Sequence, residues 1–253
     1  MSQRYYPQKD LKILLSLAAG RCAFPGCRLL CVKEGTGKDG PVFIGHIAHI
    51  HSHSDDGPRA DQSLLMKERD CYENSILLCP NHHTLVDSQP NTYTADILRS
   101  WKTKHEEWVA QQLSENIRKV SFDELEVVCK AIIRNPGPPS KDFALVDPRE
   151  KMLRNGLTEK VYFLLTLGLG KAREVERFIK NIALLDSDFP ERLRAGFVSE
   201  YHRLKVEQGF EGDALFTALQ EFASGGYFKN FERVSAGLAV LAYLFEKCEV
   251  FEK

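Results

Sequence analysis

The residues with the clearest chemistry in this chain are cysteines and histidines that occur as two short pairs. Four residues separate Cys22 from Cys27, and two residues separate Cys79 from His82. Structural zinc takes four ligands from Cys and His, usually as two such pairs from separate segments. The spacing therefore predicts a structural Zn²⁺ site, and zinc contributes roughly 10–16 kcal/mol to folding in small sites of this kind.

The spacing leaves two positions of this ligand set open. Cys31 follows Cys27 by four residues and is an alternative to Cys22, while His83 is an alternative to the adjacent His82. Cysteines that simply pack in a core are the other explanation of the pattern. Three thiols outside the pairs are predicted to be core residues: Cys71, Cys129 and Cys248.

A second set of polar residues lies between the two halves of the predicted zinc site. Residues 42–50 have the pattern of a strand, in which His46 and Ala48 share one face and His49 points to the other. Asn74 lies where its side chain can brace the loop that carries His49. Imidazoles near cysteines favour acid–base or metal chemistry.

Histidines are concentrated in this part of the chain, since seven of the eight fall between residues 46 and 105. His51 and His53 follow the predicted strand and are expected on a solvated loop. Arg59, in the same loop, is either a phosphate contact or a solvated side chain.

Composition limits the class of protein. At 253 residues and a net charge of −1, the chain can form one large or two small domains and has no global attraction to nucleic acid. Seven cysteines and a polar start to the sequence favour a reducing, cytoplasmic setting. The longest apolar runs fall short of the ~20 residues that a membrane helix needs, so no membrane span is predicted.

Local patterns predict a mixed α+β domain followed by an all-α domain. The first part contains a helix over residues 8–19, strands over 29–33 and 42–50, and a helix capped by Thr94. The apolar face of that last helix is predicted to contain Ile97, Trp101, Trp108 and Leu113.

A proline-rich segment separates the two predicted domains. Three prolines within residues 136–139 cannot continue a helix. The predicted organisation is a first domain over residues 1–120, a linker region over 121–148 and a helical interaction or oligomerisation domain over 149–253. The helices expected in the last part cover residues 149–169, 172–185, 191–207, 213–224 and 231–246.

The first domain resembles the HNH endonucleases, which have a ββα-metal fold with zinc-knuckle support. The resemblance covers roughly residues 20–110 and rests on the cysteine pairs and on several short runs. These are Ala48-His49-Ile50, Gly57-Pro58-Arg59, Asn74-Ser75-Ile76-Leu77-Leu78-Cys79, His82-His83 with Asp87, and the segment from Tyr93 to Trp108.

The resemblance implies a metal-dependent endonuclease that hydrolyses DNA phosphodiesters. It makes His49 the general base that activates water, Asn74 the residue that orients this base, and His83 a ligand of a catalytic Mg²⁺ or Mn²⁺ ion. Many HNH proteins have a metal ligand directly before the base, where this chain has Ala48. His46 is the candidate replacement ligand; the alternative is that it only packs or forms hydrogen bonds.

The second domain resembles the C-terminal domain of ABC-three-component proteins, the Lamassu-type bacterial anti-phage systems. Segments that carry this resemblance are residues 193–198, 212–216 and 236–253, above all the closing Phe-Glu-Lys-Cys-Glu-Val-Phe-Glu-Lys. The resemblance implies a nuclease effector that cuts double-stranded DNA. An SMC-like ABC ATPase and a small middle subunit would hold it inactive, and release with homo-oligomerisation would activate it.

Two other functions compete with this interpretation. One is a zinc-supported nucleic-acid-binding or scaffold subunit that has lost catalysis, which Ala48 favours. The other is a stand-alone restriction-type nuclease whose helical half reads a target.

Overall fold

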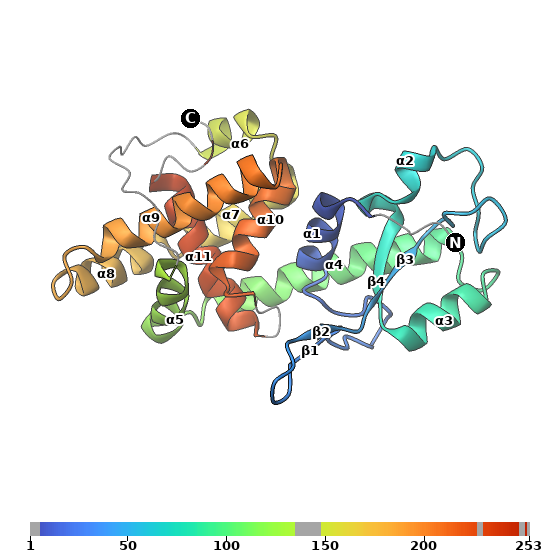
Figure 1. Cartoon of the computed structure of the whole chain (residues 1–253), viewed down its shortest axis with the longest axis horizontal. Helices are drawn as coiled ribbons and strands as arrows, with labels where there is room; N and C mark the ends of the chain where they lie inside the picture. Colours follow the sequence, from blue (N-terminus) through green and yellow to red (C-terminus); the bar gives the residue numbers. More distant parts are fainter. Residues whose placement is uncertain (1–5, 135–147, 227–229, 248–250, 252–253) are drawn as a thin grey trace. The chain divides into compact units, whose positions relative to one another are not determined.

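The structure is a computed structural model, and it describes residues 6–134, 148–226, 230–247 and 251. The chain divides into two compact units, Met1–Ala110 and Gln111–Lys253, and α4 runs across the boundary. The fold is mixed but rich in helices, with two small two-stranded sheets among the described residues (Figure 1). None of the described helices combines the length and the apolar character of a membrane span.

Unit 1 is built around a short antiparallel hairpin of β3 and β4. Its register pairs His46 with Leu78, Ala48 with Ile76, and His49 with Ser75. The elements of unit 1 are, in chain order, α1 (Gln8–Leu17), β1 (Val32–Lys33), β2 (Val42–Phe43), β3 (His46–His49), α2 (Met66–Arg69), η1 (Tyr72–Asn74), β4 (Ser75–Leu78), α3 (Pro80–Ser88) and the first part of α4 (Ala95–Ile117).

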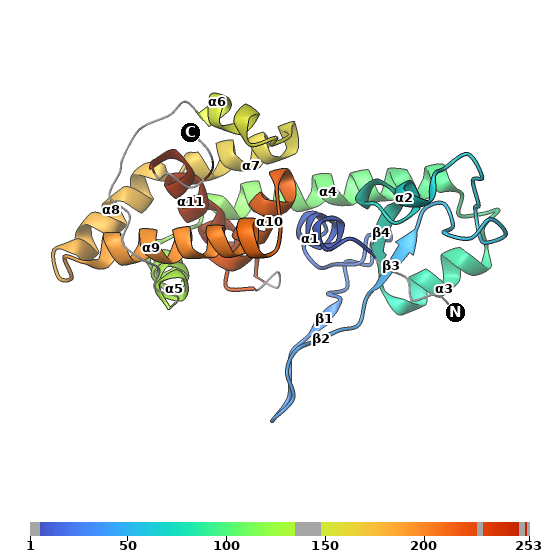
Figure 2. The same cartoon turned by 45° about the horizontal axis from the view of Figure 1, so that its top comes forward.

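The predicted strand over residues 42–50 is two strands, because the chain changes partner in the middle. β2 pairs with β1 in a narrow arm, whereas β3 pairs with β4 (Figure 2). At the junction, the Ile44 amide donates to the Cys31 carbonyl at 2.7 Å. A Cβ on Gly45 would lie 2.8 Å from the Cys31 Cβ, so this close crossing requires glycine.

The first helix is shorter than predicted. α1 ends at Leu17 because Ala19 and Gly20 both have positive φ, 48° and 59°. The Gly20 amide donates to the Leu15 carbonyl at 2.9 Å and closes the helix end.

The buried face of α4 agrees only in part with the predicted one: Leu113 is buried and Trp101 packs against the core of unit 1. Thr94 does cap the helix, with its Oγ1 accepting from the Ile97 amide at 3.4 Å, but Ile97 itself is exposed. The side that faces the core of unit 1 contains Leu98, Lys102, His105 and Val109. Lys102 and His105 can be buried on this side of the helix because their polar atoms form hydrogen bonds. Hydrophobic periodicity alone does not predict such buried polar residues.

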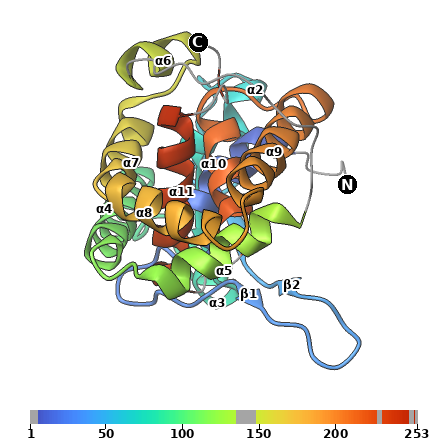
Figure 3. The same ribbon diagram turned by 90° about the vertical axis from the view of Figure 1, so that its left-hand side faces the viewer.

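Unit 2 is a helical bundle with α11 at its centre (Figure 3). α11 packs against α7, α10, α5 and α8, and Gly168 of α7 allows close approach to Ala242. Its elements beyond α4 are α5 (Phe122–Ile133), α6 (Pro148–Arg154), α7 (Glu159–Leu169), α8 (Ala172–Ala183), α9 (Phe189–His202), the π-helix η2 (Arg203–Glu207), α10 (Gly212–Ala223) and α11 (Phe231–Lys247).

Part of the predicted linker region belongs to the fold of unit 2. Residues 122–133 form α5, whose capping box pairs Ser121 with Glu124 and whose Val128 and Cys129 are buried. The proline-rich residues 135–147 lie outside the described residues, as does Cys248. Cys129 is therefore a core thiol as predicted, whereas Cys71 is only partly buried.

The predicted helix over residues 149–169 is also interrupted. α6 ends at Arg154 and Gly156 has a φ of 63°, so the chain turns before α7 begins. α7 begins directly after Thr158, whose amide donates to the Asp213 carboxylate at 2.9 Å.

Candidate functional site

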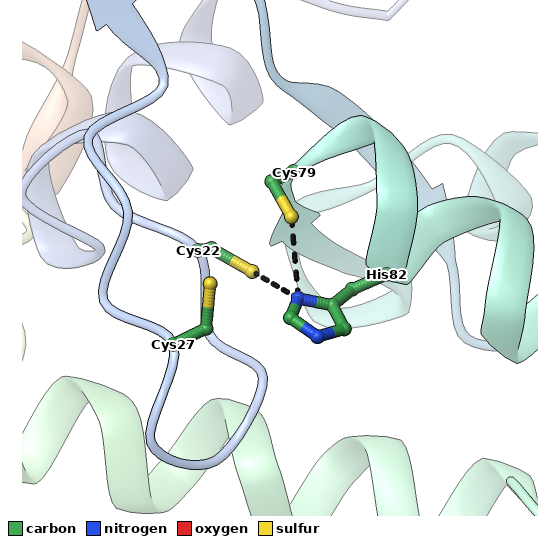
Figure 4. Close-up of side chains that lie close together, drawn as sticks. All are labelled: Cys22, Cys27, Cys79 and His82. Atoms are coloured by element: carbon green, nitrogen blue, oxygen red, sulfur yellow. Dashed lines mark hydrogen bonds between the residues drawn. The ribbon is translucent and has the colours of Figure 1, made fainter.

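Four side chains from the two predicted pairs converge in unit 1. Cys22 and Cys27 come from the loop after α1, while Cys79 and His82 come from the start of α3 (Figure 4). One ligand atom from each of the four lies within 4.8 Å of all the others. The His82 Nδ1 is 3.5 Å from the Cys22 Sγ and 3.2 Å from the Cys79 Sγ.

Local structure prepares both pairs. The first loop turns at Gly26, whose φ is 76°, and the Cys27 amide donates to the Phe24 carbonyl at 3.1 Å. In the second pair, Cys79 is the residue before α3 and Pro80 begins the helix. The Phe24 ring stacks on His82 at 3.7 Å, which holds the imidazole with its Nδ1 toward the sulfurs.

The structure decides both ambiguities in the ligand set. Cys31 is outside the cluster, and its thiol faces the Leu29 and Leu78 carbonyls at 3.7 and 3.9 Å. Burial raises the pKa of the Cys31 thiol to about 12. His83 is next to His82, but its ring lies against His46 instead.

The chemistry of the donor set fits a metal ion such as zinc. Three sulfurs and one imidazole nitrogen are the soft tetrahedral ligands that structural zinc takes. Burial raises the pKa of the Cys22 thiol, so three thiolates at this position need a cation to offset their charge. Burial also lowers the pKa of His82, which keeps its imidazole neutral and able to coordinate.

His49 lies in a different cluster. Its Nε2 is 2.8 Å from the Asp70 Oδ1, and the His53 Nδ1 is 3.0 Å from the same oxygen. The Tyr6 hydroxyl lies 3.2 Å from the His49 Nδ1 and donates to the Ile47 carbonyl. His49 thus sits at the end of β3 beside a carboxylate that orients its ring.

Sequence reasoning missed two members of this cluster. His53 was expected on a solvated loop near the DNA, whereas its side chain is 25% exposed and contacts Asp70. Asp70 belongs to none of the sequence motifs and was not predicted to be a site residue. The spacing of two histidines four residues apart, His49 and His53, is the one signal in the sequence that pointed to a shared site.

Asn74 braces the chain around His49. Its Oδ1 accepts from the His51 amide at 2.9 Å, and its Nδ2 donates to the His51 and Arg69 carbonyls, both at 2.8 Å. These bonds fix the segment after β3 against the segment that carries Asp70, so His49 and Asp70 are held at their observed separation.

Arg59 has a structural role that differs from the predicted phosphate contact. Its guanidinium donates to the Ile50, Val86 and His49 carbonyls and pairs with Asp87 at 2.6 Å. The side chain is only 5% exposed. Because these partners use the guanidinium inside the protein, Arg59 clamps β3 to α3 and is not available to an external phosphate.

His46 and His83 meet on the other face of β3. Their rings stack with centroids 4.7 Å apart, and the His83 Nε2 is 3.4 Å from the Asp87 Oδ2. Ala48 shares this face but is fully buried among core residues. His46 thus packs against His83, and its role as a metal ligand stays a prediction, whereas the ring contacts of His49 are with Tyr6 and His53.

The chain has no match among models of known protein families or among the curated proteins.

Proposed function

We propose that unit 1 hydrolyses DNA phosphodiester bonds with the help of a divalent ion, as an HNH-type endonuclease supported by a structural zinc. The observation that carries this proposal is the pair formed by His49 and Asp70, with 2.8 Å between Nε2 and Oδ1. A histidine oriented by a carboxylate at a strand end is a suitable general base. The chain order of β3, β4 and α3 also corresponds to a ββα unit.

The pair assigns a tautomer to the base. Asp70 accepts the Nε2–H of His49, so the lone pair of the neutral ring is on the Nδ1, where the Tyr6 hydroxyl lies at 3.2 Å. Water must take the place of this hydroxyl for the Nδ1 to accept its proton. Asn74 supports the same arrangement by holding the backbone on both sides of the pair.

The catalytic ion is proposed to lie on the opposite face of β3, near His83, with His46 as the additional ligand. An ion held there would polarise the phosphate and offset the charge on the leaving oxygen. In an in-line displacement, water attacks opposite to the leaving group.

Cleavage of a supercoiled plasmid in Mg²⁺ or Mn²⁺ tests this function. Wild type should nick the plasmid, and His49→Ala should lose about 100-fold or more of the rate, since a general base contributes 10²–10⁴-fold. His51→Ala is the matched control, because this neighbouring histidine contacts Arg59 and Arg99 and is outside the pair. Equal rates for wild type and His49→Ala would refute the assignment of the base.

A zinc-supported nucleic-acid-binding subunit without catalysis is the second candidate. The favouring observation is Ala48, which is fully buried where many HNH proteins have a metal ligand. DNA binding by the wild-type protein with no cleavage in either metal would support this candidate and refute the first.

We further propose that the protein acts as the nuclease effector of a Lamassu-like complex and self-associates when active. Support comes from the resemblance of the second domain and from Leu184 and Leu185, which are 86% and 89% exposed after α8. Exposed apolar side chains of this kind suit a protein contact. Copurification of the full chain with a neighbouring ATPase tests the complex, and no copurification would favour a stand-alone nuclease.

A further inference from the structure

The cluster that contains the proposed base, His49, also has the ligand types of a second metal site. His49, His53 and Asp70 each present one ligand atom within 4.8 Å of the others. A first such group, called the Cys–His group below, consists of Cys22, Cys27, Cys79 and His82. Apart from it, no other set of three His, Cys, Asp or Glu ligands in the described residues meets this distance. The His49 and His53 rings are tilted by 46°, so their nitrogens converge on the carboxylate rather than stacking.

The ligand types select a class of ion. Two imidazole nitrogens and one carboxylate oxygen suit transition metals, whereas Mg²⁺ and Ca²⁺ prefer oxygen ligands throughout. Three protein ligands also leave coordination positions for water. This site therefore differs in chemistry from the sulfur-rich centre at Cys22, Cys27, Cys79 and His82.

The protein holds the three ligands in place through contacts outside the cluster. The Arg69 guanidinium donates to the His53 carbonyl at 2.7 Å and pairs with Asp55 at 2.7 Å. The Asn74 Nδ2 donates to the Arg69 carbonyl, next to Asp70. The loop after β3 and the end of α2 are thus fixed to each other, and such preorganisation lowers the cost of binding an ion.

We propose that His49, His53 and Asp70 bind a divalent transition-metal ion, and that its binding inhibits the nuclease. The metal-binding part stands independently, and only the inhibition rests on the proposed function. Coordination by the His49 Nε2 displaces the proton that Asp70 accepts in the metal-free state. A proton on the Nδ1 then completes the neutral ring, so no lone pair remains to accept a proton from water.

Cobalt binding to the zinc-loaded full-length protein tests the site directly. The structural metal is first quantified by elemental analysis, and Co²⁺ is then titrated while visible absorbance and calorimetric heat are recorded. Wild type should bind one further equivalent, and His53→Ala should bind it about 100-fold more weakly or not at all, because one of three ligands is lost. His51→Ala should bind like wild type, since His51 lies outside the cluster.

Plasmid nicking in Mg²⁺ with added Co²⁺ tests the inhibition. Wild type should be inhibited at the concentration where the further equivalent binds, and His53→Ala should resist it. No further equivalent in wild type, or equal binding by His53→Ala, would overturn the site. Binding that leaves cleavage unchanged or accelerates it would overturn the inhibition. If the protein binds cobalt but never cleaves DNA, the site stands and the proposed nuclease function fails.

Discussion

Two buried imidazoles in unit 1 differ in their hydrogen-bond partners. His49 faces the carboxylate of Asp70, whereas His105 donates from its Nε2 to the Ala18 carbonyl at 3.0 Å and contacts the Arg28 guanidinium through its Nδ1. An anion beside a histidine favours a role in proton transfer, and a cation beside it favours the permanently neutral form. The carboxylate beside His49 supports its proposed role as a base, whereas the partners of His105 are those of a structural histidine.

At the proposed base, replacement of Asp70 by asparagine should slow DNA cleavage. The variant keeps the size of the side chain but loses the charge that orients the His49 Nε2–H. We expect the nicking rate at saturating plasmid to fall by about 100-fold, with little change in DNA affinity. Asp96→Asn is the matched control, since the Asp96 side chain is 93% exposed. A rate close to that of wild type would show that Asp70 does not act through the base.

His105 should make the stability of the protein depend on pH. Burial lowers its pKa to about 4, below the value of about 6.5 in an unfolded chain. The unfolded state therefore binds the proton first as the pH falls, and stability is lost from pH 6.5 toward pH 4. Neutral His105 contributes fully above this window.

The measurement is urea unfolding of wild type and His105→Gln at pH 7 and pH 5. Glutamine can still donate to the Ala18 carbonyl but does not titrate. Wild type should lose about 1–2 kcal/mol more than the variant between the two pH values. The same loss in both proteins would place the titrating group elsewhere.

Among the elements, α7 and α11 depend on a close contact at Gly168. A Cβ there would lie 2.5 Å from the Ala242 Cβ and 2.7 Å from the Leu238 carbonyl oxygen. Gly168→Ala should therefore push the two helices apart and destabilise unit 2 by roughly 1–3 kcal/mol, despite the better helix propensity of alanine. Thr166→Ala, at an exposed position of the same helix, should change stability much less. Thermal unfolding followed by circular dichroism measures both stability changes. Equal, small changes in the two variants would show that Gly168 is not at a tightly packed contact.

α4 also stabilises the hairpin of unit 1 through a buried lysine. The Lys102 ammonium donates to the Tyr72 and Ser75 carbonyls and lies over the Tyr72 ring. These carbonyls flank Asn74, so the helix fixes the start of β4 next to the residue that braces His49. Apolar periodicity predicted that a helix forms here. It did not predict that the side with Lys102 is buried, because that side is held by polar contacts.

At the scale of the whole molecule, the proposed metal centre belongs to one unit alone. Cys79→Ser should destabilise unit 1 by several kcal/mol, because a metal site with a missing thiolate loses much of its contribution to folding. Unit 2 should be unaffected. Cys71→Ser is the matched control, since this thiol lies in unit 1 outside the Cys–His group.

The two tryptophans make this prediction measurable in the full chain. Trp101 and Trp108 both lie in unit 1, so their fluorescence reports on that unit, whereas circular dichroism is dominated by the helices of both. In Cys79→Ser, the fluorescence transition should move to lower urea while most of the helical transition stays in place. Coincident shifts of both signals would show that the units unfold together.

The features that could be predicted are those that depend on short spacings along the chain. Cys22 with Cys27 and Cys79 with His82 are close along the chain, so a turn or the first turn of a helix is enough to bring each pair together. The same locality explains why most helices of unit 2 lie within a few residues of their predicted bounds. The composition of the Cys–His group was therefore predictable, apart from the choice between neighbouring residues.

Contacts between distant segments could not be predicted and are known from the fold alone. Cys31 is excluded because it lies at the crossing between β2 and β3, and the Arg59 guanidinium is bound by carbonyls of two separate segments, the end of β3 and α3. Asp70 reaches His49 and His53 from 21 and 17 residues away through the loop that Asn74 ties down. Such contacts depend on strand register and on buried hydrogen bonds between distant residues, and neither is encoded in local periodicity.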